Sequence, residues 1–175
     1  MRRTISIALA LVATFAIAGS ALGAANPKGG LPVATFDGAT VSVTGGEFSG
    51  LGNVPAYATL SVSGLATYEC QNPQGHSSPG QNPVQAQPGT TGPVQLPTTK
   101  NGRATIQNLS TSVTAPSTPS AQDVGCGGQG STQWTVVPTG LTATSANLTI
   151  THGLNGPVIF CRNYTLGGPA TGTAC

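Results

Sequence analysis

Apolar and polar residues alternate along much of the chain, and this alternation predicts β-strands. The clearest example is YATLSVSGLATYEC, residues 57–70, in which Leu60, Val62, Ala66, Tyr68 and Cys70 share one parity while Ser, Thr and Glu take the other. A period of two residues over this length places one side of a strand in a core and the other in solvent. We therefore expect Cys70 to be buried.

Shorter alternating segments follow one another, separated by Gly, Pro and Asn. Asp37-Gly38 lies between two such runs and predicts a hairpin, and Asn101-Gly102 and Asn155-Gly156 mark further turns. The remaining strand candidates are 82–87, 93–99, 103–113, 131–137, 141–152 and 157–166, with PGTTG (88–92) read as a turn. Seven to nine short strands without helical periodicity predict an all-β, antiparallel, immunoglobulin-like β-sandwich.

The first 25 residues predict a secretory signal peptide rather than part of the fold. Arg2 and Arg3 precede a short apolar run, and small residues permit cleavage after Gly23 or after Ala25. The remaining residues, 26–175, are enough for a single domain. A Pro/Ser/Gly-rich stretch near 115–132 predicts a long loop. We expect a secreted, extracellular protein without a membrane span in its mature chain.

The mature chain carries almost no charge. Six Lys and Arg stand against four Asp and Glu, and two of the basic residues leave with the signal peptide. A neutral surface has no basic patch with which to bind nucleic acid or anionic lipid. We therefore expect no nucleic-acid partner. The expected partner is an extracellular protein or a cell-envelope ligand, which charge alone does not identify.

Four cysteines lie in the mature chain: Cys70, Cys126, Cys161 and Cys175. An even number in an exported chain predicts two disulfides, and four cysteines allow three pairings. We prefer Cys70–Cys126 with Cys161–Cys175, because the first bond would join a strand end to the segment before Trp134 and the second would tie down the C-terminus. Cys70–Cys161, a bond across the sandwich, is the principal rival.

Three motifs carry a resemblance. The pattern C-x-N-P-x-G-x-x-x-P-G-x-N-P at 70–83, the K-N-G at 100–102, and Gly-Cys followed eight residues later by Trp134 resemble a group of small exported actinobacterial proteins of unassigned function. The resemblance covers most of the mature chain. It implies an immunoglobulin-like sandwich and brings no catalytic residues with it.

Residues able to perform chemistry are few and scattered. His76 and His152 lack the spacing of metal ligands, and the four carboxylates (Asp37, Glu47, Glu69, Asp123) show no Asp-x-Asp pattern. We predict no catalytic residue, no metal site and no cofactor. A hydrolase that uses His76 or His152 is the less favoured alternative, and Trp134 is expected in the core rather than on a sugar-binding platform.

The stretch CQNPQGHSSPGQNP, residues 70–83, predicts a rigid loop at one end of the sandwich. Asn-Pro favours extended backbone, Pro-Gly favours a turn, and a disulfide at Cys70 would fix the base. Loops on rigid scaffolds commonly bind partners. We expect a non-enzymatic binding or surface-interaction module; a protease-inhibitor-like protein that presents this loop, or the 115–132 loop, is the alternative. The candidate contact residues are Asn72, Pro73, His76, Pro79 and Asn82.

Overall fold

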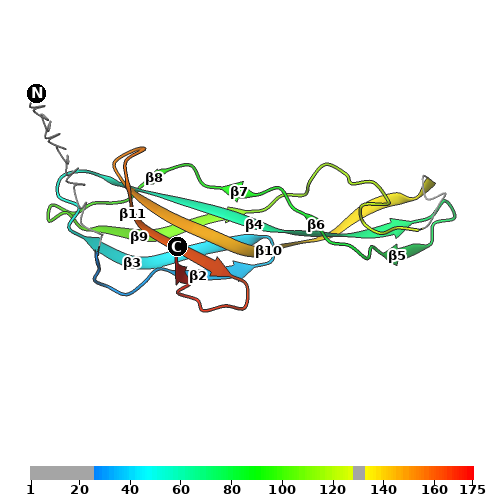
Figure 1. Ribbon diagram of the computed structural model, residues 1–175, viewed down its shortest axis with the longest axis horizontal. Coiled ribbons are helices and arrows are strands. Elements are labelled where there is room, and N and C mark those ends of the chain that lie inside the picture. Colours follow the sequence, from blue (N-terminus) through cyan, green and yellow to red (C-terminus); the bar gives the residue numbers. More distant parts are fainter. Residues whose placement is uncertain (1–25, 128–132) are drawn as a thin grey trace, which may run out of the picture.

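The computed structural model describes residues 26–127 and 133–175, and in these residues the chain is all-β (Figure 1). The strands in chain order are β1 (Asn26–Pro27), β2 (Val33–Asp37), β3 (Thr40–Ser49), β4 (Ala56–Gln71), β5 (Ser77–Pro79), β6 (Val84–Gln85), β7 (Gly89–Thr90), β8 (Val94–Gln95), β9 (Ala104–Ser112), β10 (Thr135–His152), β11 (Val158–Thr165) and β12 (Thr173–Ala174). The predicted signal peptide, residues 1–25, and the end of the predicted long loop, residues 128–132, lie outside the described residues. Within the described part, no helix is long and apolar enough to cross a membrane.

The strands form two antiparallel sheets. In sheet A, β3 is central, with β1 and β2 paired along one edge and β9 along the other. In sheet B, the order is β12-β11-β10-β4, and the four short strands β5 to β8 pair one after another with the outer edge of β4. The predicted antiparallel, all-β architecture is confirmed.

The two sheets pack face to face around one main core. Sheet A contributes Val41, Val43 and Phe48, and sheet B contributes Leu60 and Leu148, all of them fully buried. The alternation predicted for residues 57–70 is confirmed: the expected parity is buried from Leu60 through Cys70, while its neighbours are wholly or partly exposed. The burial of these apolar side chains is the main term that stabilises the sandwich.

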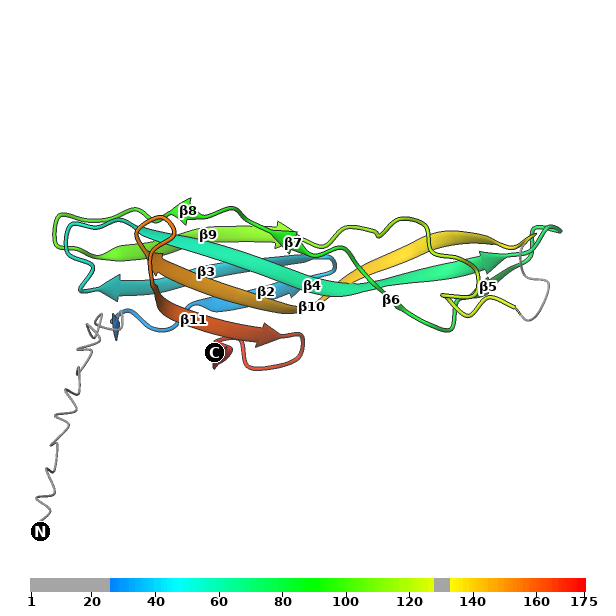
Figure 2. The same ribbon diagram turned by 45° about the horizontal axis from the view of Figure 1, so that its top comes forward.

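Two strands are much longer than the rest. β4 has 16 residues and β10 has 18, and they pair from Ala56↔His152 to Gln71↔Thr135. Figures 1 and 2 show that this pair continues well beyond the ends of β2, β3 and β9, which gives the molecule its elongated shape. Sheet B therefore extends past sheet A at one end.

Residues 26–127 and 133–175 contain twelve strands where seven to nine were expected, and six of the twelve have only two or three residues. The hairpin at Asp37-Gly38 is confirmed, with Gly38 at φ 54°. Two strands were expected here, at 131–137 and 141–152. Their described residues from Thr135 on belong instead to the single strand β10, whose register shifts between Pro138 and Gly140. A bulge of this kind accommodates a proline inside a sheet. PGTTG is only partly a turn, because Gly89 and Thr90 pair with β4.

Candidate functional site

Sheet B extends past sheet A at one end. This extension, residues 66–83 and 133–140, forms a distal arm together with the segment 115–127 that covers it. On the side of β4 that faces sheet A in the sandwich, the segment 115–127 takes the place of sheet A and covers the arm. A second, smaller core lies beneath this covering segment; its buried members are Ala66, Tyr68, Cys70, Val124 and Cys126. In the described arm, β4 and β10 are joined by the three-residue strand β5, and a ribbon this narrow is marginally stable in water, so the arm depends on this cover.

A disulfide fixes the covering segment to β4. Cys70 and Cys126 are bonded, with 5.5 Å between their Cα atoms, and each is 1% exposed. The bond closes a sequence separation of 56 residues, for which the chain-entropy account gives about 4 kcal/mol. The preferred pairing is thus confirmed, and the Cys70–Cys161 alternative is wrong.

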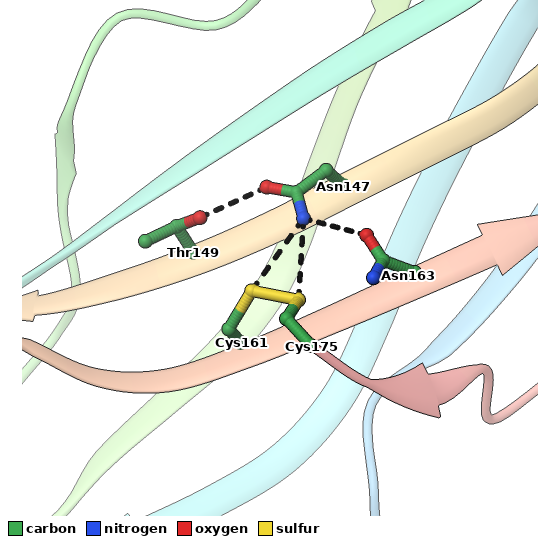
Figure 3. Close-up of a disulfide and its surroundings, with 5 residues drawn as sticks. All are labelled: Asn147, Thr149, Cys161, Asn163 and Cys175. Carbon is green, nitrogen blue, oxygen red and sulfur yellow. Dashed lines mark hydrogen bonds between the residues drawn. A yellow bond between two sulfur atoms is a disulfide. The ribbon is translucent and has the colours of Figure 1, made fainter.

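The second disulfide, Cys161–Cys175, lies far from the arm and ties the C-terminus to β11. Figure 3 shows the Asn147 amide beside it: Nδ2 donates to Sγ of Cys161 (3.5 Å) and of Cys175 (3.3 Å), and to Oδ1 of Asn163 (2.8 Å). Thr149 donates to Asn147 Oδ1 at 2.9 Å, which fixes the amide orientation. This bridge therefore stabilises the body of the protein.

Backbone hydrogen bonds also hold the covering segment in place. The carbonyl of Val124 accepts from the amides of Gln81 (2.9 Å) and Asn82 (3.1 Å), so the covering segment is bound to the loop that follows β5. Asp123 Oδ2 accepts from the hydroxyl of Ser120 (2.7 Å) and from its amide (3.0 Å). The bond from the Ser120 hydroxyl and, to a smaller extent, the bond from its amide hold the pKa of Asp123 below its ordinary value. The segment is thus an ordered turn.

The predicted contact residues all lie in the distal arm. Asn72 begins the turn after β4, and its Oδ1 accepts from the amides of Gln74 (3.0 Å) and His76 (2.9 Å), the arrangement of an Asx turn. The Asn72 side chain, which is partly buried, therefore shapes the turn. The other four candidates are exposed: Pro73, His76, Pro79 and Asn82. The loop is shorter than expected, because Ser77–Pro79 pair with β4 as β5.

The two histidines lie at opposite ends of the molecule. His152 ends β10 opposite Ala56, whereas His76 lies beyond Gln71 at the other end of β4, so the ladder between them spans roughly 50 Å. His152 Nε2 is 2.9 Å from the carbonyl oxygen of Leu51, which gives this ring a structural partner. A site that combines both rings is therefore excluded.

The carboxylates are equally dispersed. Glu47 forms an ion pair with Arg103 at 3.2 Å, and Asp123 is engaged by Ser120, as described above. Asp37 ends β2 and Glu69 lies on the exposed side of β4. In residues 26–127 and 133–175, no group of three or more His, Cys, Asp or Glu is arranged to hold a metal ion.

A cavity that the sequence did not predict lies in the arm, between the covering segment and the start of β10. Its volume is about 390 Å³, and its lining residues are Thr118, Pro119, Ser120, Ala121, Trp134, Thr135 and Val136. Trp134 was expected in the sandwich core; it is instead half-buried, with part of its surface on the second core and part lining this cavity. The sequence signal for this position was the short spacing between Cys126 and Trp134, which keeps the ring near the segment that the disulfide holds.

The aromatic side chains do not form a shared platform. Tyr68 and Tyr164 are buried, and Tyr57 pairs with Gln95 and Thr151 at the end of β4 opposite the arm. Among the aromatic residues that the structure describes, Trp134 alone lines the arm cavity.

Comparison of the chain with protein-family models, curated proteins and solved structures finds no match. The fold and the site describe the molecule as a disulfide-linked antiparallel β-protein with two sheets and a projecting arm that the segment 115–127 covers.

Proposed function

We propose that the protein is a secreted, extracellular, non-enzymatic binding module whose distal arm contacts a partner in the cell envelope or the extracellular medium. The observation that carries this proposal is the arm itself. The main core contributes little stability to a ribbon that projects beyond it. Here the ribbon is stabilised instead by a buried disulfide and by the covering segment. A rigid projection with an exposed tip loses little conformational entropy on binding, which favours recognition.

Two further features support the proposal. The histidines and carboxylates of the described residues do not converge, so the binding role is favoured over hydrolysis. Both disulfides and the signal-like first 25 residues favour an exported protein. Because of the motifs at 70–83 and 125–134, we also propose a relationship to the small exported actinobacterial proteins with an immunoglobulin-like sandwich.

The protease-inhibitor alternative has less support. Its reactive segment would be the 71–83 loop or the 115–132 loop. Ser77–Pro79 of the first is held in the ladder with β4, and the described part of the second, 115–127, is bonded to β4 through Cys126. Inhibition assays against serine and cysteine proteases test it directly, and stoichiometric inhibition by the purified domain would replace the binding-module proposal.

The binding proposal is tested by comparing variants at the two ends of the molecule. A distal variant carries Pro73→Ala, His76→Ala and Asn82→Ala, and a matched control carries Val54→Ala and Leu154→Ala in exposed loops at the opposite end. In pull-downs from culture supernatant and cell-envelope extracts, we expect wild type and control to capture the same partner and the distal variant to lose it. Equal capture by all three proteins would exclude the arm tip as the contact surface.

A further inference from the structure

The cavity beside Trp134 has two walls that are fixed before any ligand arrives. One wall is the covering segment at Thr118–Ala121, which is held by the Ser120–Asp123 bonds and by the Cys126 amide, which donates to the Ala121 carbonyl at 2.7 Å. The other is the start of β10, where Val136 pairs with Cys70 in the ladder. Because Cys70 is bonded to Cys126, the same disulfide joins both walls. A preformed cleft of this kind binds with a small entropic cost.

The lining combines one large aromatic ring with hydroxyl groups. Trp134, Val136 and Pro119 supply the apolar surface, while Thr118, Ser120 and Thr135 supply hydroxyls. The Ser120 hydroxyl donates to Asp123 Oδ2 and accepts from the Asp123 amide (3.3 Å), so its oxygen keeps one acceptor position. The Thr135 hydroxyl donates to the Gln71 carbonyl (3.3 Å), so its oxygen is left as an acceptor. Small-molecule sites typically have this composition, with an apolar wall and a few placed polar groups, in volumes of about 300–1,000 Å³.

The charge around the cavity restricts the ligand further. In the described residues of the arm, there is no Lys or Arg, and the charged side chains are Glu69 and Asp123, both exposed. Phosphate, sulfate and uronate groups would meet no counter-charge here. A neutral ligand that offers both hydroxyl donors and an apolar face fits these conditions, and the pyranose ring of a sugar is such a ligand.

We infer that this cavity is a binding site for a neutral oligosaccharide, with one sugar ring stacked on Trp134 and its hydroxyls bonded to Ser120 and Thr135. The inference deepens the proposed function, on which it rests, by assigning the arm a ligand class. It places the sugar site on the side of the arm, while the loop at its tip remains free for other contacts.

The test uses the intrinsic fluorescence of Trp134, which is the single tryptophan of the chain. The mature protein is titrated with chitohexaose, cellohexaose and mannohexaose, and with an oligogalacturonate as the anionic comparison. We expect at least one neutral sugar to change the emission saturably and the anionic sugar to have no effect. Calorimetry should show binding weakened about tenfold or more in Trp134→Ala and largely kept in Trp134→Phe, which preserves an aromatic face.

Tyr57→Ala is the matched control, because it removes an aromatic ring at the opposite end of β4, and it should bind as wild type does. Thermal unfolding of each variant establishes that the fold is kept. No response to any neutral sugar, equal binding by Trp134→Ala, or a response only to the anionic sugar would overturn the inference. If the sugars fail while the distal variant still loses its partner in pull-downs, the sugar site alone is refuted and the binding module stands.

Discussion

Replacing Cys70 and Cys126 together by alanine is expected to release the covering segment from the arm. The bond closes a separation of 56 residues, so its loss should lower the free energy of unfolding by about 4 kcal/mol. What would still hold the segment is the burial of Val124, about 1.5–3 kcal/mol, and its two backbone bonds, about 1 kcal/mol each. Ordering the backbone of the segment 115–127 costs about 1–2 kcal/mol per residue, which exceeds what these remaining interactions return. The arm should therefore open while the sandwich persists.

Urea unfolding followed by two signals measures this effect. Tryptophan emission reports on the arm, because Trp134 packs against its small core, and far-ultraviolet circular dichroism reports on the sheets. We expect the emission to be shifted to the red already in native buffer, and the midpoint of the circular-dichroism transition to fall by roughly 2 M, for an m-value of about 2 kcal/mol/M.

The control removes the other disulfide, Cys161–Cys175. Its separation of 14 residues corresponds to about 3 kcal/mol, so global stability should fall while native emission stays unchanged. The reasoning is refuted if the Cys70/Cys126 variant keeps the emission and midpoint of wild type, or if the control shifts the native emission equally.

Three other predictions follow from burial and close contacts. Dithiothreitol should reduce Cys161–Cys175 before the buried bridge, because Cys175 is exposed, and mass spectrometry after alkylation would contradict this by showing the opposite order. Burial raises the pKa of Tyr164 from 10.0 to about 12, so the stabilising contribution of this side chain is complete below pH 10 and is lost as the pH rises through about 12. The melting temperature should therefore fall between pH 10 and about 12. A fall of the same size in Tyr164→Phe would show that Tyr164 ionisation is not the cause. Gly80→Ala should cost about 1–3 kcal/mol, because the new Cβ would lie 2.8 Å from the Tyr68 carbonyl oxygen, and an unchanged urea midpoint would show that the arm tolerates it.

The side of each strand that is buried could be predicted from the sequence, whereas what covers that side could not. Leu60 and Cys70 share one parity in β4, and both are buried as expected. Yet Leu60 packs in the main core and Cys70 beneath the covering segment. Alternation reports only that a face is buried, so it could not distinguish a sandwich core from an arm with its own cover.

The predicted strand boundaries were wrong where a local turn signal, such as Pro or Gly, competed with hydrogen-bonded pairing to β4. Pro138 and Gly140 suggested a break, but a bulge absorbs both within β10, because pairing with β4 continues on either side. Residues 84–95 look like separate strands and instead follow the edge of β4 in two-residue pieces. These outcomes depend on tertiary pairing, which no short window of sequence contains.

The candidate site was predicted in part. The position of the loop at 70–83 at one end, and its closure through Cys70, followed from turn chemistry and cysteine count. The cavity beside Trp134 was not predicted, because it forms between segments near residues 120 and 135 that are brought together by pairing with β4, by the second core and by the Cys70–Cys126 bond.

Hydrogen–deuterium exchange in the presence of a cell-envelope fraction from the producing organism tests the central claim, that the distal arm is the binding end, most directly. Backbone amides of the whole mature chain are followed with and without the fraction. The account predicts added protection in peptides that cover 71–83 and 115–127, with the rest of the sandwich unchanged. Protection confined to the opposite end, at 50–55 and 153–157, or spread evenly over both sheets, would contradict it.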